Sequence, residues 1–195
     1  LAKGTNLDIV SQAEAIDDHA ALSADLVALG YASYVVELLD KFTYEEDEHG
    51  GVYRLLRDTL GRLAAEDQAE VVVRYYEVRL LEMLGFRPEL HRCLSCGKQI
   101  LAEDQYFSTQ QGGVLCPECG ERDASAQPIS MQALKYLRHF QRSSYRDATR
   151  AHPAVSVQLE LETLMNHYIS YLLERGLNSP RLLRRMREQS REALN

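Results

Sequence analysis

The sequence predicts a mainly α-helical protein: a helical bundle domain interrupted by an inserted four-cysteine zinc module. Apolar residues recur every three or four positions before residue 88 and again after residue 129, as on one face of a helix. Between them, residues 89–128 collect glycines, prolines and all four cysteines of the 195-residue chain. The contents of 45% hydrophobic and 26% charged residues are typical of a globular protein. No apolar run approaches the ~20 residues that span a bilayer, so we expect no membrane partner.

The first residues differ from the rest of the chain. In residues 3–16, Leu7 and Ile9 alternate with polar residues, which predicts a strand. Such a strand has no visible partner, and the chain begins at Leu1 rather than at a methionine. We therefore interpret residues 1–16 as the end of a preceding β domain.

Three helices are predicted before the cysteine-rich insertion, over residues 20–41, 51–64 and 66–84. Gly85 can end the third helix in a left-handed cap, and Pro88 prevents its continuation. Residues 44–50 form an acidic loop that lacks the ligand spacing of a calcium site, which favours a solvated loop over a cation site.

Within the insertion, residues 105–108 and 114–115 flank a Gln-Gln-Gly-Gly turn, which predicts a short hairpin. The helical period returns after it. Ser130 can cap a helix that begins at Met131, and a further helix runs from Val155 to Leu173. Gly176 is expected to end that helix, and Ser179-Pro180 to start another.

The four cysteines have the spacing of a metal site. Cys93 and Cys96 form one C-x2-C pair, and Cys116 and Cys119 form a second pair after 19 intervening residues. A hairpin between two such knuckles brings four thiolates to one tetrahedral zinc ion. A glycine follows each knuckle, where a Cβ would crowd the backbone N–H groups that turn toward sulfur. Four ligands leave no open position for substrate, so the predicted zinc is structural.

Three other arrangements remain open. The thiols can form two disulfides in any of three connectivities, one pair can act as a redox motif, or the neighbouring His91 can replace a cysteine as ligand. The paired knuckles favour the four-thiolate site over each of these.

Charge is distributed unevenly. The net charge is −7, yet residues 131–195 hold 11 Lys and Arg against 6 Asp and Glu. Two groups of arginines there recur at helical spacing. The first is Arg138, Arg142 and Arg146, and the second is Arg181, Arg184, Arg185, Arg187 and Arg191. Because guanidinium binds phosphate in a bidentate fashion, both stripes are candidate nucleic-acid surfaces. A solvated basic helix is the alternative interpretation.

The sequence contains no H-E-x-x-H, P-loop or G-x-S-x-G motif, and its six histidines are scattered. No enzymatic activity is therefore predicted. A zinc-ribbon enzyme whose catalytic domain lies elsewhere remains an alternative.

Several segments, in order along nearly the whole chain, together resemble the bacterial recombination-repair family RecO. They are Gly4-Thr5-Asn6-Leu7-Asp8-Ile9, Tyr31-Ala32-Ser33-Tyr34, Leu84-Gly85-Phe86, Gly112-Gly113-Val114-Leu115-Cys116 and Gly176-Leu177-Asn178-Ser179. The resemblance implies an N-terminal OB-fold, of which residues 1–16 are a strand remnant, followed by a helical domain (17–88 and 129–195) that contains the zinc module (89–128). The reading Ser179-Pro180-Arg181 departs from the Ser-Arg usual in this family, which leaves the role of Arg181 open.

The resemblance also implies a function. It predicts a recombination mediator in DNA repair that binds single- and double-stranded DNA, anneals strands, docks RecR and single-strand binding protein, and thereby promotes RecA loading in the cytoplasm, at the nucleoid. Residues 74–86 look similar to the segment that captures the tail of single-strand binding protein, with Arg74, Tyr76 and Leu80 as candidates. The alternatives are that Tyr76 and Leu80 are core residues of their helix, and that the chain is a protein-only adaptor with a scaffolding zinc module.

Overall fold

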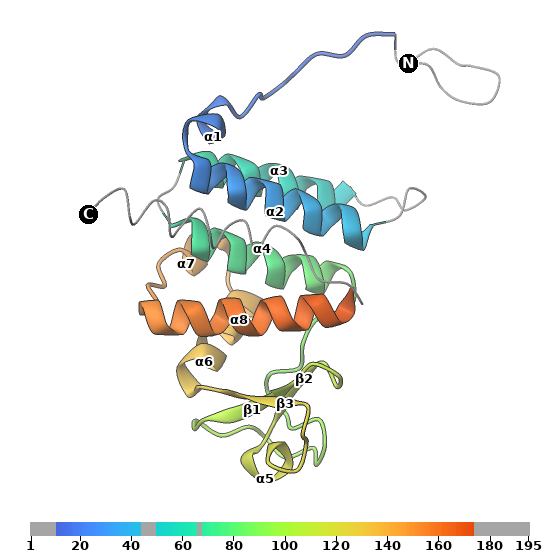
Figure 1. The fold of residues 1–195 in the computed structure, drawn as a ribbon, viewed down its shortest axis with the longest axis vertical. Helices are drawn as coiled ribbons and strands as arrows, with labels where there is room; N and C mark the ends of the chain where they lie inside the picture. The colour runs from blue at the N-terminus through green and yellow to red at the C-terminus, as the bar shows by residue number, and fades with distance from the viewer. Residues whose placement is uncertain (1–10, 44–49, 66–67, 174–195) are drawn as a thin grey trace, which may run out of the picture.

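The structure is a computed structural model that describes residues 11–43, 50–65 and 68–173. Figure 1 shows a stack of helices with a small sheet at one end of the long axis and α1 at the other. In chain order the elements are α1 (Ala20–Ala24), α2 (Leu26–Phe42), α3 (Gly50–Ala65), α4 (Ala69–Met83), β1 (Gln105–Ser108), β2 (Gly113–Leu115), α5 (Pro117–Gly120), β3 (Ala126–Ile129), α6 (Met131–Arg142), α7 (Tyr145–Ala148) and α8 (Val155–Leu172). None of the described helices is both long and apolar enough to cross a membrane.

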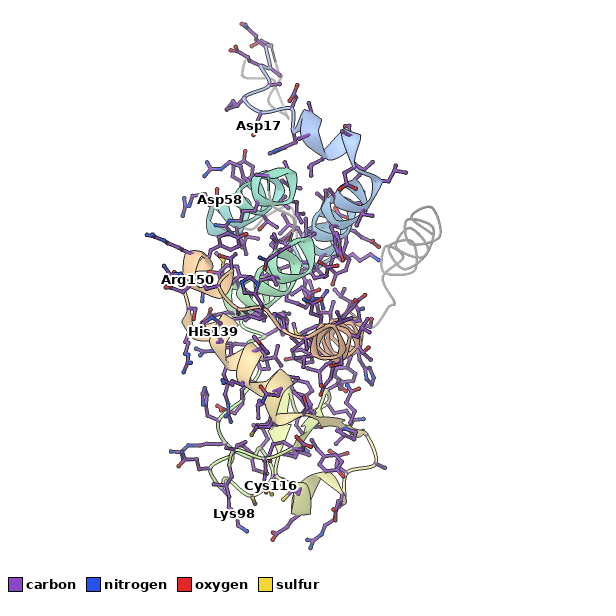
Figure 2. The ribbon with its side chains drawn as sticks, turned by 90° about the vertical axis from the view of Figure 1, so that its left-hand side faces the viewer. Asp17, Asp58, Lys98, Cys116, His139 and Arg150 are labelled. Atoms are coloured by element: carbon purple, nitrogen blue, oxygen red, sulfur yellow. The ribbon has the colours of Figure 1, made fainter. Side chains whose placement is uncertain are left out.

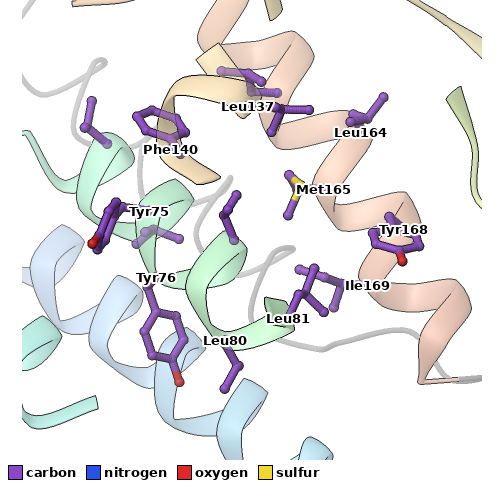
Figure 3. Close-up of a cluster of buried hydrophobic side chains, with 14 of the residues drawn as sticks. Tyr75, Tyr76, Leu80, Leu81, Leu137, Phe140, Leu164, Met165, Tyr168 and Ile169 are labelled. Atoms are coloured by element: carbon purple, nitrogen blue, oxygen red, sulfur yellow. The ribbon is translucent and has the colours of Figure 1, made fainter. Parts of the chain in front are cut away.

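The central element is α4. It contacts α2 and α3 on one side and α6, α7 and α8 on the other, so it joins the two halves of the helical region across the insertion. Figure 3 shows Tyr76 and Leu80 pointing toward α2, while Leu81 points toward Ile169 of α8. A helix enclosed in this way is buried on all sides, which explains why even Arg74 and Glu77 of α4 are buried.

The first predicted helix is divided in two. The chain leaves helical geometry at Asp25, whose carboxylate accepts hydrogen bonds from the N–H groups of Val27 (2.8 Å) and Ala28 (3.3 Å). This N-cap starts α2, and a buried Leu22 keeps α1 on the core. Asp25, a residue type that caps helices, lies within the apolar pattern of residues 20–41, and it was the sequence signal for this break.

The end of α4 agrees with its prediction. Gly85 has φ +81°, and the N–H of Phe86 donates to the carbonyl of Leu81 at 2.7 Å, while the N–H of Gly85 donates to Glu82 at 3.2 Å. These two bonds form a Schellman motif, which ends the helix where the insertion begins.

The predicted hairpin is present and carries a third strand. Tyr106 of β1 pairs with Leu115 of β2, and Phe107 of β1 pairs with Gln127 of β3, both antiparallel, in the order β2-β1-β3. The strand β3 was missed because Pro128 lies within it, and proline is tolerated there only since the strand is at the edge of the sheet.

After the insertion, the two helices with long apolar stripes, α6 and α8, were predicted close to their observed bounds. Ser130 caps α6 by accepting a hydrogen bond from the N–H of Ala133 at 3.1 Å, and α8 ends one residue before the predicted boundary. The short α7 was not predicted. Residues 11–19 carry no regular secondary structure, and the predictions for residues 1–10, 44–49 and 174–195 fall outside the described residues.

Candidate metal centre and basic groove

Two tight turns present the four thiols. The first knuckle closes when the N–H of Gly97 donates to the carbonyl of Cys93 at 2.8 Å, and the second when the N–H of Gly120 donates to the carbonyl of Cys116 at 2.8 Å. The two glycines are required for reasons other than crowding near sulfur. Gly97 has φ +72°, a left-handed conformation, and a Cβ on Gly120 would overlap the ring of Tyr106.

The thiols converge on one point. All four sulfur atoms lie within 4.8 Å of one another, and the Sγ atoms of Cys96 and Cys116 are 3.8 Å apart. A tetrahedral site with metal–sulfur bonds of about 2.3 Å has sulfur–sulfur edges of about 3.8 Å, so the donor set fits such an ion. The four cysteines are free thiols rather than disulfides, and His91 is not among the grouped ligands. This cluster can hold a metal ion.

The protonation of the thiols is unequal. Burial raises the pKa of the Cys93 thiol, but backbone N–H donors from Cys116, Cys96 and Ser95 outweigh burial and lower its pKa to about 6. The pKa of Cys116 is raised to about 12, first by burial and then by hydrogen bonds among the thiols. The backbone donors therefore favour the thiolate form of Cys93. Further thiolates this close together need a cation to offset their repulsion, as a bound divalent metal does.

Residues 86–90 form a linker between α4 and the cysteine-rich region. Three side chains of α6 and α8 donate hydrogen bonds to its carbonyl groups. Arg138 donates from Nε (2.9 Å) and from an Nη (2.6 Å) to the carbonyl of Leu90, Gln141 donates to the carbonyl of Pro88 at 2.8 Å, and Tyr168 donates to that of Phe86 at 3.0 Å. Arg138 is half-buried, and two of its guanidinium nitrogens are bonded to the carbonyl of Leu90; its predicted role in DNA binding stays a prediction.

Of the other two arginines of that stripe, Arg142 lines a groove, whereas Arg146 is exposed on α7 and is not among the residues that line it. The groove has a volume of about 450 Å³ and lies between α6 and the segment after α7, with Lys135, Tyr136 and Arg142 on one wall and Arg150 on the other. Figure 2 shows His139 and Arg150 on the same flank of the molecule. Sequence reasoning singled out Arg142 but missed Lys135, Tyr136 and Arg150. The spacing of 135, 139 and 142, which places them on one helix face, was the available signal.

The three candidates for tail binding lie in the core. Tyr76 and Leu80 have no exposed surface, Arg74 is 7% exposed, and the Tyr76 hydroxyl donates to the carbonyl of Val35 at 2.9 Å. Tyr76 and Leu80 are therefore core residues of their helix, as the alternative interpretation states, and Arg74 pairs with Glu77 at 2.8 Å. The predicted tail arginines, which are Arg181, Arg184, Arg185, Arg187 and Arg191, lie outside the described residues.

These features define a class of protein: an arrangement of helices around α4, into which a four-thiol metal-binding module is inserted. The chain belongs to the RecO family. The family model described as "Recombination protein O C terminal" matches residues 23–181.

Curated relatives agree with this membership. The chain is 35% identical over 191 residues to "DNA repair protein RecO" of Roseiflexus sp., covering 98% of this chain and 68% of that protein. It is 34% identical over 175 residues to the protein of that name from Dehalococcoides mccartyi, covering 90% and 69%. It is 43% identical over 137 residues to that of Desulforudis audaxviator, covering 70% and 54%. The expected family resemblance is confirmed.

Proposed function

We propose that this chain is the DNA-binding helical and zinc portion of a recombination mediator in DNA repair. The observation that carries the proposal is the groove between α6 and the segment after α7, where Lys135, Arg142 and Arg150 surround one hollow and Asp147 is the one acidic residue among the described residues of its lining. Three cations against one carboxylate leave an excess positive charge, which suits the phosphates of a nucleic acid. The names of the relatives place those proteins in DNA repair, which agrees with this chemistry.

The zinc ion in this proposal is structural. Cys93, Cys96, Cys116 and Cys119 would complete its coordination, and the ion would stand in for the apolar core that a module of about 40 residues cannot build by itself. In Figure 1 the strands and α5 of the module lie beneath α6 and α8, a position that suits a support for residues 86–90, which bond to α6.

Membership of the RecO family supports a wider proposal. We propose that the protein anneals DNA strands, docks RecR and single-strand binding protein and promotes RecA loading, acting in the cytoplasm at the nucleoid. The arginines of residues 181–191 would add to the DNA surface as a sequence-based part of the same proposal. The competing function is a protein-only adaptor, in which the groove cations serve solubility alone.

The test is fluorescence anisotropy of a labelled single strand, titrated with the chain at several salt concentrations. Binding to phosphate weakens steeply with salt. The double variant Arg142→Gln with Arg150→Gln is expected to reduce the slope of log K against log salt by about 1.4, because each lost phosphate contact on a single strand contributes about 0.7.

A matched control changes the same number of cations elsewhere. Arg54 and Arg57 of α3 are exposed and lie outside the groove, so Arg54→Gln with Arg57→Gln is expected to leave the slope unchanged. Equal losses in both double variants would show that only overall charge matters. No binding at low salt would favour the adaptor.

A further inference from the structure

The groove contains an aromatic ring between its cations, and this arrangement suits a base better than a phosphate alone. Tyr136 is half-buried on α6 and lines the groove beside Lys135. Its ring lies 6.4 Å from that of Phe140, with an interplanar angle of 37°, so it is backed by the core rather than free in solvent. A ring supported from behind is a ready platform for stacking.

The cations are placed to hold phosphates on both sides of that ring. Lys135 and Arg142 are seven residues apart on α6, which separates them by about 10 Å along the helix axis. At that separation they suit two different phosphates rather than one. Arg150 approaches from the segment after α7, on the opposite wall.

Two other polar residues of the groove, His139 and Asp147, are already engaged. The two ring nitrogens of His139 lie 3.0 Å from the Ser143 hydroxyl and 3.2 Å from the carbonyl of Asp147, so this histidine links α6 to α7. The carboxylate of Asp147 accepts from the Ser144 hydroxyl at 2.7 Å and pairs with Arg150 at 3.5 Å. That exposed pair is weak, and a phosphate can displace the carboxylate from Arg150.

We propose that this groove is a nucleotide-binding subsite for single-stranded nucleic acid, in which the Tyr136 ring stacks on one unpaired base while Lys135, Arg142 and Arg150 hold the neighbouring phosphates. The inference rests on the proposed DNA-binding function and adds a strand preference to it. A volume of about 450 Å³ falls in the range of small-ligand sites and accommodates one base with its sugar. In a duplex the bases are already stacked on each other, so the ring gains nothing from them.

The direct test uses the absence of tryptophan from this chain. The variant Tyr136→Trp places one indole in the groove, and stacking on a base quenches indole fluorescence. Tyr53→Trp is the matched control, since Tyr53 is 64% exposed on α3, also beside exposed arginines, but lies outside the groove. Each variant is titrated with a thymidine oligonucleotide, with a duplex of equal length, and with a poly-glutamate peptide.

The expected result is quenching of Tyr136→Trp by the single strand alone, with no quenching of Tyr53→Trp. In parallel, Tyr136→Leu is expected to weaken single-strand binding about tenfold, equivalent to about 1.4 kcal/mol, with duplex binding unchanged. Tyr136→Phe retains the ring and is expected to retain the affinity. Circular dichroism confirms that each variant is folded.

Failure of this inference and failure of the proposed function give different results. Single-strand binding by anisotropy without quenching at position 136, or equal quenching by duplex, would overturn the stacking site and leave the DNA-binding function in place. Quenching by poly-glutamate and not by the oligonucleotide would make the groove an acidic-peptide site. Absence of any DNA binding by anisotropy would remove both.

Discussion

Arg138 of α6 donates two hydrogen bonds to one acceptor, the carbonyl oxygen of Leu90, which has no exposed surface. Burial also lowers the pKa of Arg138, so its guanidinium has given up part of its hydration for this contact. The residues are 48 positions apart, and they join the helical region to the start of the cysteine-rich module. A residue that resembles a DNA-binding cation in the sequence is thus part of the framework.

We therefore predict that one arginine of this stripe, Arg138, contributes to stability, whereas another, Arg142, contributes to DNA binding. Arg138→Gln is expected to lower the free energy of unfolding by about 1–3 kcal/mol, because the buried Leu90 carbonyl loses charge-assisted bonds. Arg142→Gln removes an exposed cation and is expected to change stability by less than about 0.5 kcal/mol while weakening DNA binding. Urea denaturation and anisotropy measure the two effects. An unaltered unfolding midpoint for Arg138→Gln would contradict the structural role.

Tyr168 makes another contact between the two regions. Its hydroxyl donates to the carbonyl of Phe86, and its ring packs edge-on against Phe107 of β1 at a centroid distance of 5.4 Å. Tyr168→Phe removes only the hydrogen bond and is expected to cost about 1 kcal/mol. Tyr168→Ala also removes the ring contact and is expected to cost about 3–5 kcal/mol. If thermal denaturation gave equal losses for both variants, the ring contact would contribute nothing.

The buried carboxylate of α4 gives a pH-dependent prediction. Glu77 accepts a hydrogen bond from the Tyr34 hydroxyl at 2.6 Å and pairs with Arg74 at 2.8 Å, yet its complete burial raises its pKa to about 7 against the attraction of Arg74. The folded state therefore binds this proton more tightly than the unfolded state does. Between pH about 4.5 and 7 the contribution of Glu77 to stability falls as pH rises, by an amount on the order of 1–3 kcal/mol.

The measurement compares urea unfolding at pH 5 and pH 8 for the unmodified chain and for Glu77→Gln. The amide cannot ionise, so the unmodified chain is expected to lose stability relative to Glu77→Gln on going to pH 8. The exposed Glu121→Gln serves as control and is expected to follow the unmodified chain. Identical pH dependence of the chain and of Glu77→Gln would show that Glu77 keeps one protonation state throughout.

The sequence predicted those parts of the fold whose signals are local. Long apolar stripes identified α3, α4, α6 and α8, and Gly85 and Ser130 marked an end and a start because their caps involve only neighbouring residues. The x2 spacing of the cysteines identified the metal-binding cluster in the same way, since each knuckle is a closed local turn.

The parts that were missed depend on contacts between distant residues. The four-residue α7 is held because Tyr145 lies against Tyr75 at 5.3 Å and beneath the guanidinium of Arg62 at 3.6 Å, which no local pattern reveals. The groove likewise needs Arg150, which the turn after α7 brings to α6. Periodicity shows that residues share a face, but it does not show whether another helix covers that face, which is why buried Arg74 resembled a binding residue.

The metal gives the last prediction. We expect one zinc ion per chain by elemental analysis of protein purified without chelator, and none for Cys96→Ser with Cys119→Ser, because two thiolates do not complete the site. Ser95→Ala is the control, since it changes an exposed side chain inside the knuckle and leaves the backbone donor to Cys93 in place.

Loss of the ion is expected to destabilise the cysteine-rich module locally while the helices stay folded. Removing the metal with a chelator is expected to abolish amide protection in β1 and β2, which lie between the two knuckles that the metal would join, while α2 and α4 remain protected by the helical core. Hydrogen exchange resolves the two regions in one experiment. Because Arg138 and Gln141 bond to carbonyls of the linker, exchange should also rise at residues 88–92, next to α6. Uniform loss of protection across the chain would instead mean that the module and the helices unfold as one unit, and unchanged protection would exclude a structural role for the metal.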